Sequence, residues 1–214
     1  MSLRVNEIFH SIQGESLYSG RPCVFIRLTG CNLRCTYCDT TYAYDEGKSF
    51  EIEELLETVR HFGCSLVEVT GGEPLLQAGT PELIDRLLSI GNEVMLETNG
   101  SLDISTVNPD CIKIVDVKCP SSGESEQNRT ENFSLLTDRD QVKFVIGDAT
   151  DYDYAKKTLN LLPPHLQQHH VLFSPVSSIL TPDILAQWIL RDHLSVRLHL
   201  QLHKFIWPDV ERGR

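Results

Sequence analysis

The chain has 214 residues, which suits one sizeable α/β domain. Its hydrophobic content of 41% with 23% charged residues excludes a disordered, collagen-like or coiled-coil protein. Nineteen basic and thirty acidic residues give a net charge of −11, which argues against general nucleic-acid binding but permits a small local basic pocket.

The apolar runs are short and the cysteines are unevenly spaced. The longest apolar run is residues 23–26, so we expect no membrane contact and no export signal. Three of the seven cysteines crowd into residues 31–38, which is too close for a secreted disulfide framework. The sequence therefore predicts a soluble protein of the reducing cytoplasm that binds a metal.

Short β-branched or aromatic runs alternate with amphipathic stretches along most of the chain, which is typical of βα units and a mainly parallel sheet. No low-complexity linker divides the chain, so residues 1–214 are predicted to form a single domain. The expected strands are residues 5–9, 23–29, 66–70, 93–97, 112–118, 141–146, 171–174 and 196–202.

Three amphipathic stretches are predicted to be helices. One runs from Ile52 to Phe62 with an apolar stripe and a stop at Gly63. The others begin at Thr80 and Thr181, where a capping hydroxyl precedes a proline at the first helical position.

Two polar features occur in the later part of the chain, a polar loop and a row of polar side chains on the last expected strand. Residues 121–132 are rich in Ser, Glu and Asn, so we predict a mobile loop that serves as a lid. In the expected last strand, leucines share one face and polar side chains the other. That polar row either faces solvent or lines the mouth of a barrel, and it consists of Arg197, His199, Gln201 and His203.

Cys31, Cys35 and Cys38 form a C-x3-C-x2-C cluster at the exit of an apolar strand. Scattered cysteines would produce this spacing by chance in about one chain in a hundred. Structural zinc sites use paired C-x2-C motifs with four ligands, and no second pair occurs here. An iron–sulfur cube matches better, and three ligands leave one iron open to bind something else.

This spacing, with the aromatic Tyr37 before the last cysteine, resembles the signature of the radical S-adenosylmethionine (SAM) superfamily. The resemblance implies a [4Fe-4S] cluster that cleaves SAM to a 5′-deoxyadenosyl radical. The run 70–74, Thr-Gly-Gly-Glu-Pro, resembles the motif that binds the methionine amino group, and residues 97–100 resemble a further strand-end motif. Either run alone is typical of an ordinary turn.

Narrower motifs outside the cluster resemble the 7-carboxy-7-deazaguanine synthase family. They are residues 7–16, 25–31, 38–40 and 201–204. The resemblance implies an incomplete, pared-down (β/α) barrel that forms a homodimer. It also implies the substrate, 6-carboxytetrahydropterin, and the product, 7-carboxy-7-deazaguanine. The radical would remove a hydrogen atom from C6 of the pterin, the six-membered ring would contract, and one nitrogen would leave as ammonia. The reaction would require SAM, Mg²⁺ and an external one-electron reductant.

The resemblance also implies which residues do this. Arg27 would hold the substrate carboxylate through two parallel hydrogen bonds, unless it serves a structural ion pair. Thr40 would offer its hydroxyl to Mg²⁺, and His203 would meet the heterocycle unless it is a packing histidine. Further substrate contacts would be Ile12, Gln13, Gly14 and Thr70. The SAM contacts would be Thr36, Tyr37, Asp39, Gly72, Glu73, Asp116, Val117, Lys118 and Ser174.

Two other functions fit part of these observations. An activase of glycyl-radical enzymes shares the cysteine loop but has no evident use for the Gln-Gly-Glu or Cys-Asp-Thr motifs. A non-catalytic zinc or iron–sulfur module would use the net charge of −11 to bind a basic partner protein. The charged tail 209–214 departs from the family pattern, so the resemblance does not extend to a contact made by the terminal carboxylate.

Overall fold

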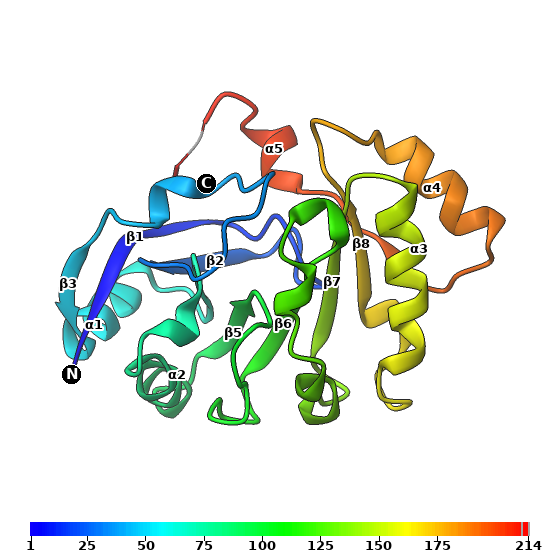
Figure 1. The fold of residues 1–214 in the computed structure, drawn as a ribbon. Helices are drawn as coiled ribbons and strands as arrows, with labels where there is room; N and C mark the ends of the chain where they lie inside the picture. The colour runs from blue at the N-terminus through cyan, green and yellow to red at the C-terminus, as the bar shows by residue number, and fades with distance from the viewer. Residues whose placement is uncertain (211, 214) are drawn as a thin grey trace.

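In the computed structural model, which describes residues 1–210 and 212–213, a curved nine-stranded sheet carries helices along its outer side (Figure 1). The strand order is β3-β1-β2-β4-β5-β6-β7-β8-β9. The pairs from β2 to β9 are parallel, whereas β1 is antiparallel to both β2 and β3. The strands are β1 (Ser2–Ile12), β2 (Pro22–Leu28), β3 (Lys48–Glu51), β4 (Leu66–Gly71), β5 (Glu93–Thr98), β6 (Ile112–Val117), β7 (Gln141–Ile146), β8 (Val171–Pro175) and β9 (Arg197–Leu198).

The sheet does not close on itself in the described residues, because β3 and β9 end it on opposite sides. This architecture confirms the predicted α/β class and the incomplete barrel. The α-helices are α1 (Ile52–Phe62), α2 (Thr80–Ser89), α3 (Ala149–Thr158), α4 (Pro182–Arg191) and α5 (Leu202–Ile206). The short 3-10 helices are η1 (Thr41–Ala43), η2 (Pro74–Leu76), η3 (Pro120–Ser122), η4 (Ser125–Gln127), η5 (Thr130–Leu135), η6 (Leu159–Leu161) and η7 (Gln168–His170).

The predicted helices occur where the apolar stripes place them. The buried face of α1 packs against the sheet, and the helix ends at Gly63 in the left-handed region with φ 63°. At α2 the cap differs from the prediction: Gly79 occupies the cap position, and the Thr80 hydroxyl instead donates to the Pro74 carbonyl at 2.6 Å.

Two apolar clusters fill the space between the sheet and its helices. The first joins α1 and α2 to the strands from β1 to β5, and the second joins α3 and α4 to β6, β7 and β8. The isolated cysteines Cys23, Cys111 and Cys119 are buried, and Cys64 is half-buried against the first cluster. Among the described residues, no helix has both the length and the apolar character needed to cross a bilayer.

The prediction of a last strand over residues 196–202 is correct only for residues 197–198. Strand β9 ends at Leu198, and α5 begins at Leu202, whose backbone N–H donates to the Gly14 carbonyl at 2.8 Å. The leucines therefore do not share one face: Leu200 is exposed, whereas His199 of the polar row is buried. A tertiary contact with residue 14 overrides the local alternation.

The segment 121–132 is not a mobile lid but a run of 3-10 helices tied to the body of the protein. The Asn132 side chain donates to the carbonyls of Gly100 and Leu102 at 3.0 and 2.8 Å. Asn128 exchanges hydrogen bonds with the Lys118 backbone, both at 2.8 Å. The polar residues that suggest mobility are thus the groups that anchor the segment.

Candidate active site

A cavity of about 430 Å³ opens at the carboxyl ends of the parallel strands. The ends of β2, β4, β5, β6, β7 and β8 all contribute to its wall. The loop after β2, the turn after β1 and the chain around α5 also contribute to its wall. This is the edge of an open α/β sheet at which ligands usually bind.

All three clustered cysteines line this cavity as free thiols. In the described residues, no group of three or more His, Cys, Asp or Glu side chains converges on a single metal ion. The thiols that hold a cube of iron and sulfur stand around a larger body than one ion, so three thiols in one cavity without a single-ion site suit such a cluster better than a four-ligand zinc site.

The backbone behind the thiols is shaped for close approach. Gly72 follows β4, and a Cβ atom there would lie 2.2 Å from the Gly30 carbonyl oxygen and 2.7 Å from the Cys31 Cβ. Only glycine lets these two loops meet. Burial raises the pKa of Cys31 and Cys35, and the nearby Lys118 ammonium offsets this rise only in part.

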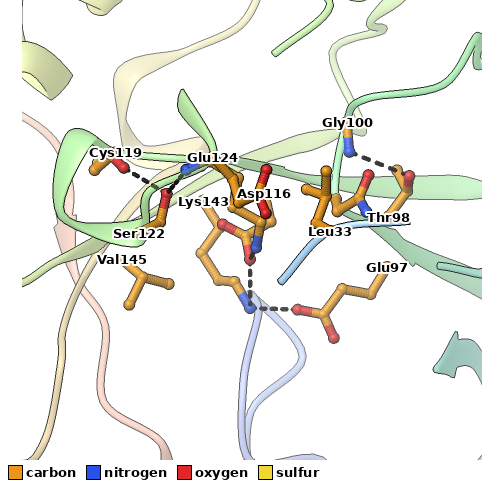
Figure 2. Close-up of polar contacts among 12 residues, drawn as sticks. Leu33, Glu97, Thr98, Gly100, Asp116, Cys119, Ser122, Glu124, Lys143 and Val145 are labelled. Atoms are coloured by element: carbon orange, nitrogen blue, oxygen red, sulfur yellow. Dashed lines mark hydrogen bonds and ion pairs between the residues drawn. The ribbon is translucent and has the colours of Figure 1, made fainter. Parts of the chain in front are cut away.

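A network of buried and half-buried charges lines the same cavity as the thiols, with Lys143 at its centre. The Lys143 ammonium bonds Glu97, lies 3.0 Å from Glu15 Oε2 and lies 3.9 Å from Asp116 Oδ2, and Figure 2 shows it between Glu97 and Asp116. Lys118 also pairs with Asp116, at 2.7 Å. The other carboxylate oxygen of Asp116 is buried and has no hydrogen-bond partner among the described residues, so it can accept from a ligand.

Glu68 adds a carboxyl group to the same wall. It is 4% exposed and accepts a hydrogen bond from the Gln13 side chain. Burial, with the Glu97 charge nearby, raises the pKa of Glu68 to about 8. Glu68 is therefore mostly protonated at neutral pH and can donate a hydrogen bond.

Comparison with known proteins agrees with this geometry. Residues 25–116 match the family model of the radical SAM superfamily. The 7-carboxy-7-deazaguanine synthase of Chlorobaculum tepidum is 45% identical over 99% of this chain and 97% of its own length. That of Koribacter versatilis is 42% identical over 99% of this chain and its whole length. The chain belongs to the 7-carboxy-7-deazaguanine synthase family.

The fold comparison agrees with this membership. The crystal structure of QueE from Escherichia coli has a TM-score of 0.80 at 22% identity, covering 95% of both chains. Membership in the 7-carboxy-7-deazaguanine synthase family confirms the predicted enzyme class, a radical SAM lyase, and implies a [4Fe-4S] cluster and SAM. The three thiols, the glycine cradle and the unpartnered Asp116 oxygen fit these two groups.

Most residues predicted from the resemblance to the synthase family line the cavity. For Arg27, Thr40 and His203, the positions agree with the expected contacts with substrate and Mg²⁺, although the roles remain predictions. The other predicted residues in the wall are Gln13, Gly14, Cys31, Cys35, Tyr37, Cys38, Asp39, Thr70, Gly72, Asp116, Lys118 and Ser174.

Four predicted residues, Ile12, Thr36, Glu73 and Val117, lie outside the cavity wall. Glu73 is fully buried, and its carboxylate accepts from the Asn99 backbone at 2.7 Å and the Thr98 hydroxyl at 2.9 Å. It thus joins the loops after β4 and β5 from behind. The Thr36 hydroxyl donates to the Ser121 carbonyl at 2.7 Å.

Several charged residues of the wall escaped the sequence prediction as individual site residues: Glu15, Glu68, Glu97 and Lys143. Their signal is a charged side chain within or beside an apolar strand. Glu68 stands two residues before Thr70, so both point to the same side of β4. Glu15 belongs to a motif that the sequence singles out, but its pairing with Lys143 is a long-range contact.

Replacing Gly72 with alanine should displace the loop that carries Cys31, because the new Cβ would overlap backbone atoms. We expect a loss of about 1–3 kcal/mol in the free energy of unfolding and a lower iron content after reconstitution. Gly79→Ala is the control, since its Cβ would meet only side-chain atoms of Met1 and Leu3. Equal iron content in the two variants would contradict the cradle assignment.

Replacing Glu68 with glutamine should change how stability depends on pH. Between pH 4.5 and about 8 the folded wild type keeps a proton on Glu68 that the unfolded chain releases, so this residue's contribution falls as pH rises. The stability of the wild type relative to Glu68→Gln should therefore decline across that window, by at most about 1.4 kcal/mol per pH unit. Urea unfolding at pH 5, 6, 7 and 8 measures this difference, and a flat difference would contradict the assignment.

Proposed function

We propose that the chain catalyses the Mg²⁺-dependent conversion of 6-carboxytetrahydropterin to 7-carboxy-7-deazaguanine and ammonia, a step of queuosine or other deazapurine biosynthesis. The products contain all the atoms of the substrate, so the conversion needs no net oxidant. The observation that carries the proposal is one cavity lined by three thiols together with Arg27 and a network of charged side chains around Lys143. A protein-activating enzyme has no evident use for the Gln-Gly-Glu motif of residues 13–15, which lines this cavity.

When bound, the cluster and SAM supply a carbon radical that removes a hydrogen atom from the substrate. Cys31, Cys35 and Cys38 would hold the cluster. The strand ends at Gly72, Asp116 to Lys118 and Ser174, with the segment 36–39 and Glu73, would hold SAM. Glu73 does not line the cavity, so it would contribute indirectly: its carboxylate accepts from the Asn99 backbone and so fixes the loop that begins at Gly72.

The substrate would occupy the charged side of the cavity. Arg27 would grip the carboxylate with its planar guanidinium. Gln13, Gly14 and Thr70 would border the heterocycle together with His203, and Ile12 would support this border from outside the wall. Gly14 and His203 are packed closely, since a Cβ on Gly14 would lie 2.2 Å from the His203 Nδ1.

Mg²⁺ would bind the Thr40 hydroxyl and oxygen atoms of the substrate, because this hard cation prefers oxygen ligands. The Thr40 hydroxyl donates to Asp39 Oδ1 at 3.0 Å, and Asp39 in turn pairs with Lys204 at 2.9 Å. Lys204 thus compensates the charge of Asp39, and both residues line the cavity. We further propose that the chain works as a homodimer in the cytoplasm, with an external one-electron reductant.

Anaerobic turnover with the pterin, SAM and a chemical reductant tests the function. We expect 7-carboxy-7-deazaguanine and ammonia in equal amounts, at a rate that rises with Mg²⁺. Thr40→Ala should need at least about tenfold more Mg²⁺ than wild type to reach half of its maximal rate, whereas Thr41→Ala should behave as wild type. Deoxyadenosine released only with a glycyl-radical protein, and no pterin product, would contradict the proposal.

A further inference from the structure

Arg27 is held from one side by an anionic partner. Glu7 and Arg27 face each other across the antiparallel pair of β1 and β2, and Arg27 Nε donates to Glu7 Oε1 at 2.8 Å. Each side chain is 16% exposed. Within residues 1–210 and 212–213, neither Nη atom of Arg27 makes a hydrogen bond, so the end of the guanidinium is available to a ligand carboxylate.

Glu7 binds two further groups around Arg27. The Tyr42 hydroxyl donates to the same oxygen, Oε1, at 3.2 Å. The backbone N–H of Gly213 donates to the other oxygen, Oε2, at 3.2 Å, and Gly213 also lines the cavity. Glu7 itself does not line the cavity.

After α5, the described residues of the carboxyl-terminal tail contact β1 and η1. The Arg212 guanidinium lies 4.2 Å from the Tyr42 ring centre and 2.9 Å from Glu46. The tail thus reaches the group of Glu7, Arg27 and Tyr42 through backbone and side chain. Of the tail residues, Glu211 and Arg214 with the terminal carboxylate lie outside the described residues.

We propose that Glu7 is a positioning residue: its Oε1 orients Arg27 side-on, leaving both Nη atoms for the substrate carboxylate, and its Oε2 fastens the tail beside the cavity. This inference rests on the proposed role of Arg27. Removing the Glu7 charge does not weaken the attraction between Arg27 and a carboxylate. The loss is in orientation, which affects kcat more than KM because a displacement of about 1 Å costs about a hundredfold in rate.

Two substitutions separate the two functions of Glu7. Glu7→Leu removes both oxygens. Glu7→Gln keeps one oxygen and places an amide group at the other position. The glutamine amide can be oriented so that its oxygen accepts from Arg27 and Tyr42, which retains two of the three hydrogen bonds. Only the Gly213 N–H then faces a donor, the amide NH₂ group, so we expect this orientation to be favoured.

We expect Glu7→Leu to lower kcat about a hundredfold with KM changed by no more than about threefold. Glu7→Gln should keep kcat within about threefold of wild type but exchange the Gly213 amide proton faster. The control, Glu53→Gln, removes the ion pair with Arg86 outside the cavity and should alter neither quantity.

Normal kcat in Glu7→Leu, or an equal loss of kcat in Glu7→Gln, would overturn the inference. If Glu7→Leu does not fold, the near-isosteric Glu7→Gln still decides, because slow Gly213 exchange or a hundredfold loss of kcat contradicts the division of roles. Absence of pterin turnover in the wild type would instead refute the proposed function, so the two failures are distinguishable.

Discussion

Replacement of Cys35 by alanine is expected to reduce pterin turnover to the background of the assay. With one of three thiols removed, the cavity wall offers only Cys31 and Cys38, and a cube of iron and sulfur needs a ligand for each of its closed corners. Cys35 is only half-buried, so the folded structure should survive the change. Iron content, acid-labile sulfide and turnover measured on the same preparation check this expectation.

Cys64→Ala is the matched control for that experiment. Cys64 is also half-buried and free, but it packs beside the first apolar cluster and not along the cavity wall. We expect iron content and turnover equal to wild type. Equal loss of iron in both variants would mean that the alanine substitution acts through stability and not through the cluster.

Replacing Lys143 with methionine is expected to cost about 3 kcal/mol of the free energy of unfolding, because it leaves the half-buried carboxylates of Glu15 and Glu97 without the buried ammonium that they share. The Lys143 side chain is 8% exposed and contacts Glu15, Glu97 and Asp116. Burial lowers the pKa of Lys143, but Glu15 and Glu97 outweigh it and raise the pKa well above its usual value. Denaturant unfolding at pH 7 measures the loss.

Lys113→Met separates stability from function. Lys113 and Asp140 form a buried pair at 3.2 Å, with side chains 3% and 0% exposed, and neither lines the cavity. We expect a comparable loss of stability but a normal KM for the pterin in the fraction that stays folded. Lys143→Met should change the KM as well. A normal KM in Lys143→Met would contradict the assignment of the charge network to the substrate site.

The parallel half of the sheet was predictable because its strands are short apolar runs separated by longer polar or amphipathic segments. Strand β3 was not: Lys48–Glu51 has exposed or half-buried side chains and pairs only with the edge of β1. The change from strand to helix near Leu202 depends on the distant Gly14 carbonyl. The order of residues 121–132 depends on side-chain amides bonded to distant backbone, which composition does not reveal.

The site likewise has one part that local sequence motifs predict and another part that depends on contacts between distant residues. The thiols and the glycine pair are local motifs, so their spacing predicts one wall of the cavity. The charged part of the wall is built from single residues on separate strands, such as Glu68 and Lys143, and only the register of the sheet brings them together. Likewise, the burial of Glu73 behind the wall follows from its bonds to β5 and the loop after it and not from its motif.

Electron paramagnetic resonance of the anaerobically reconstituted and reduced protein, recorded with and without SAM, tests most directly that three thiols hold a cluster with one open iron. We predict about four irons and four sulfides per chain and a signal that changes on addition of SAM. One zinc ion without sulfide, or a cluster signal indifferent to SAM, would contradict the account.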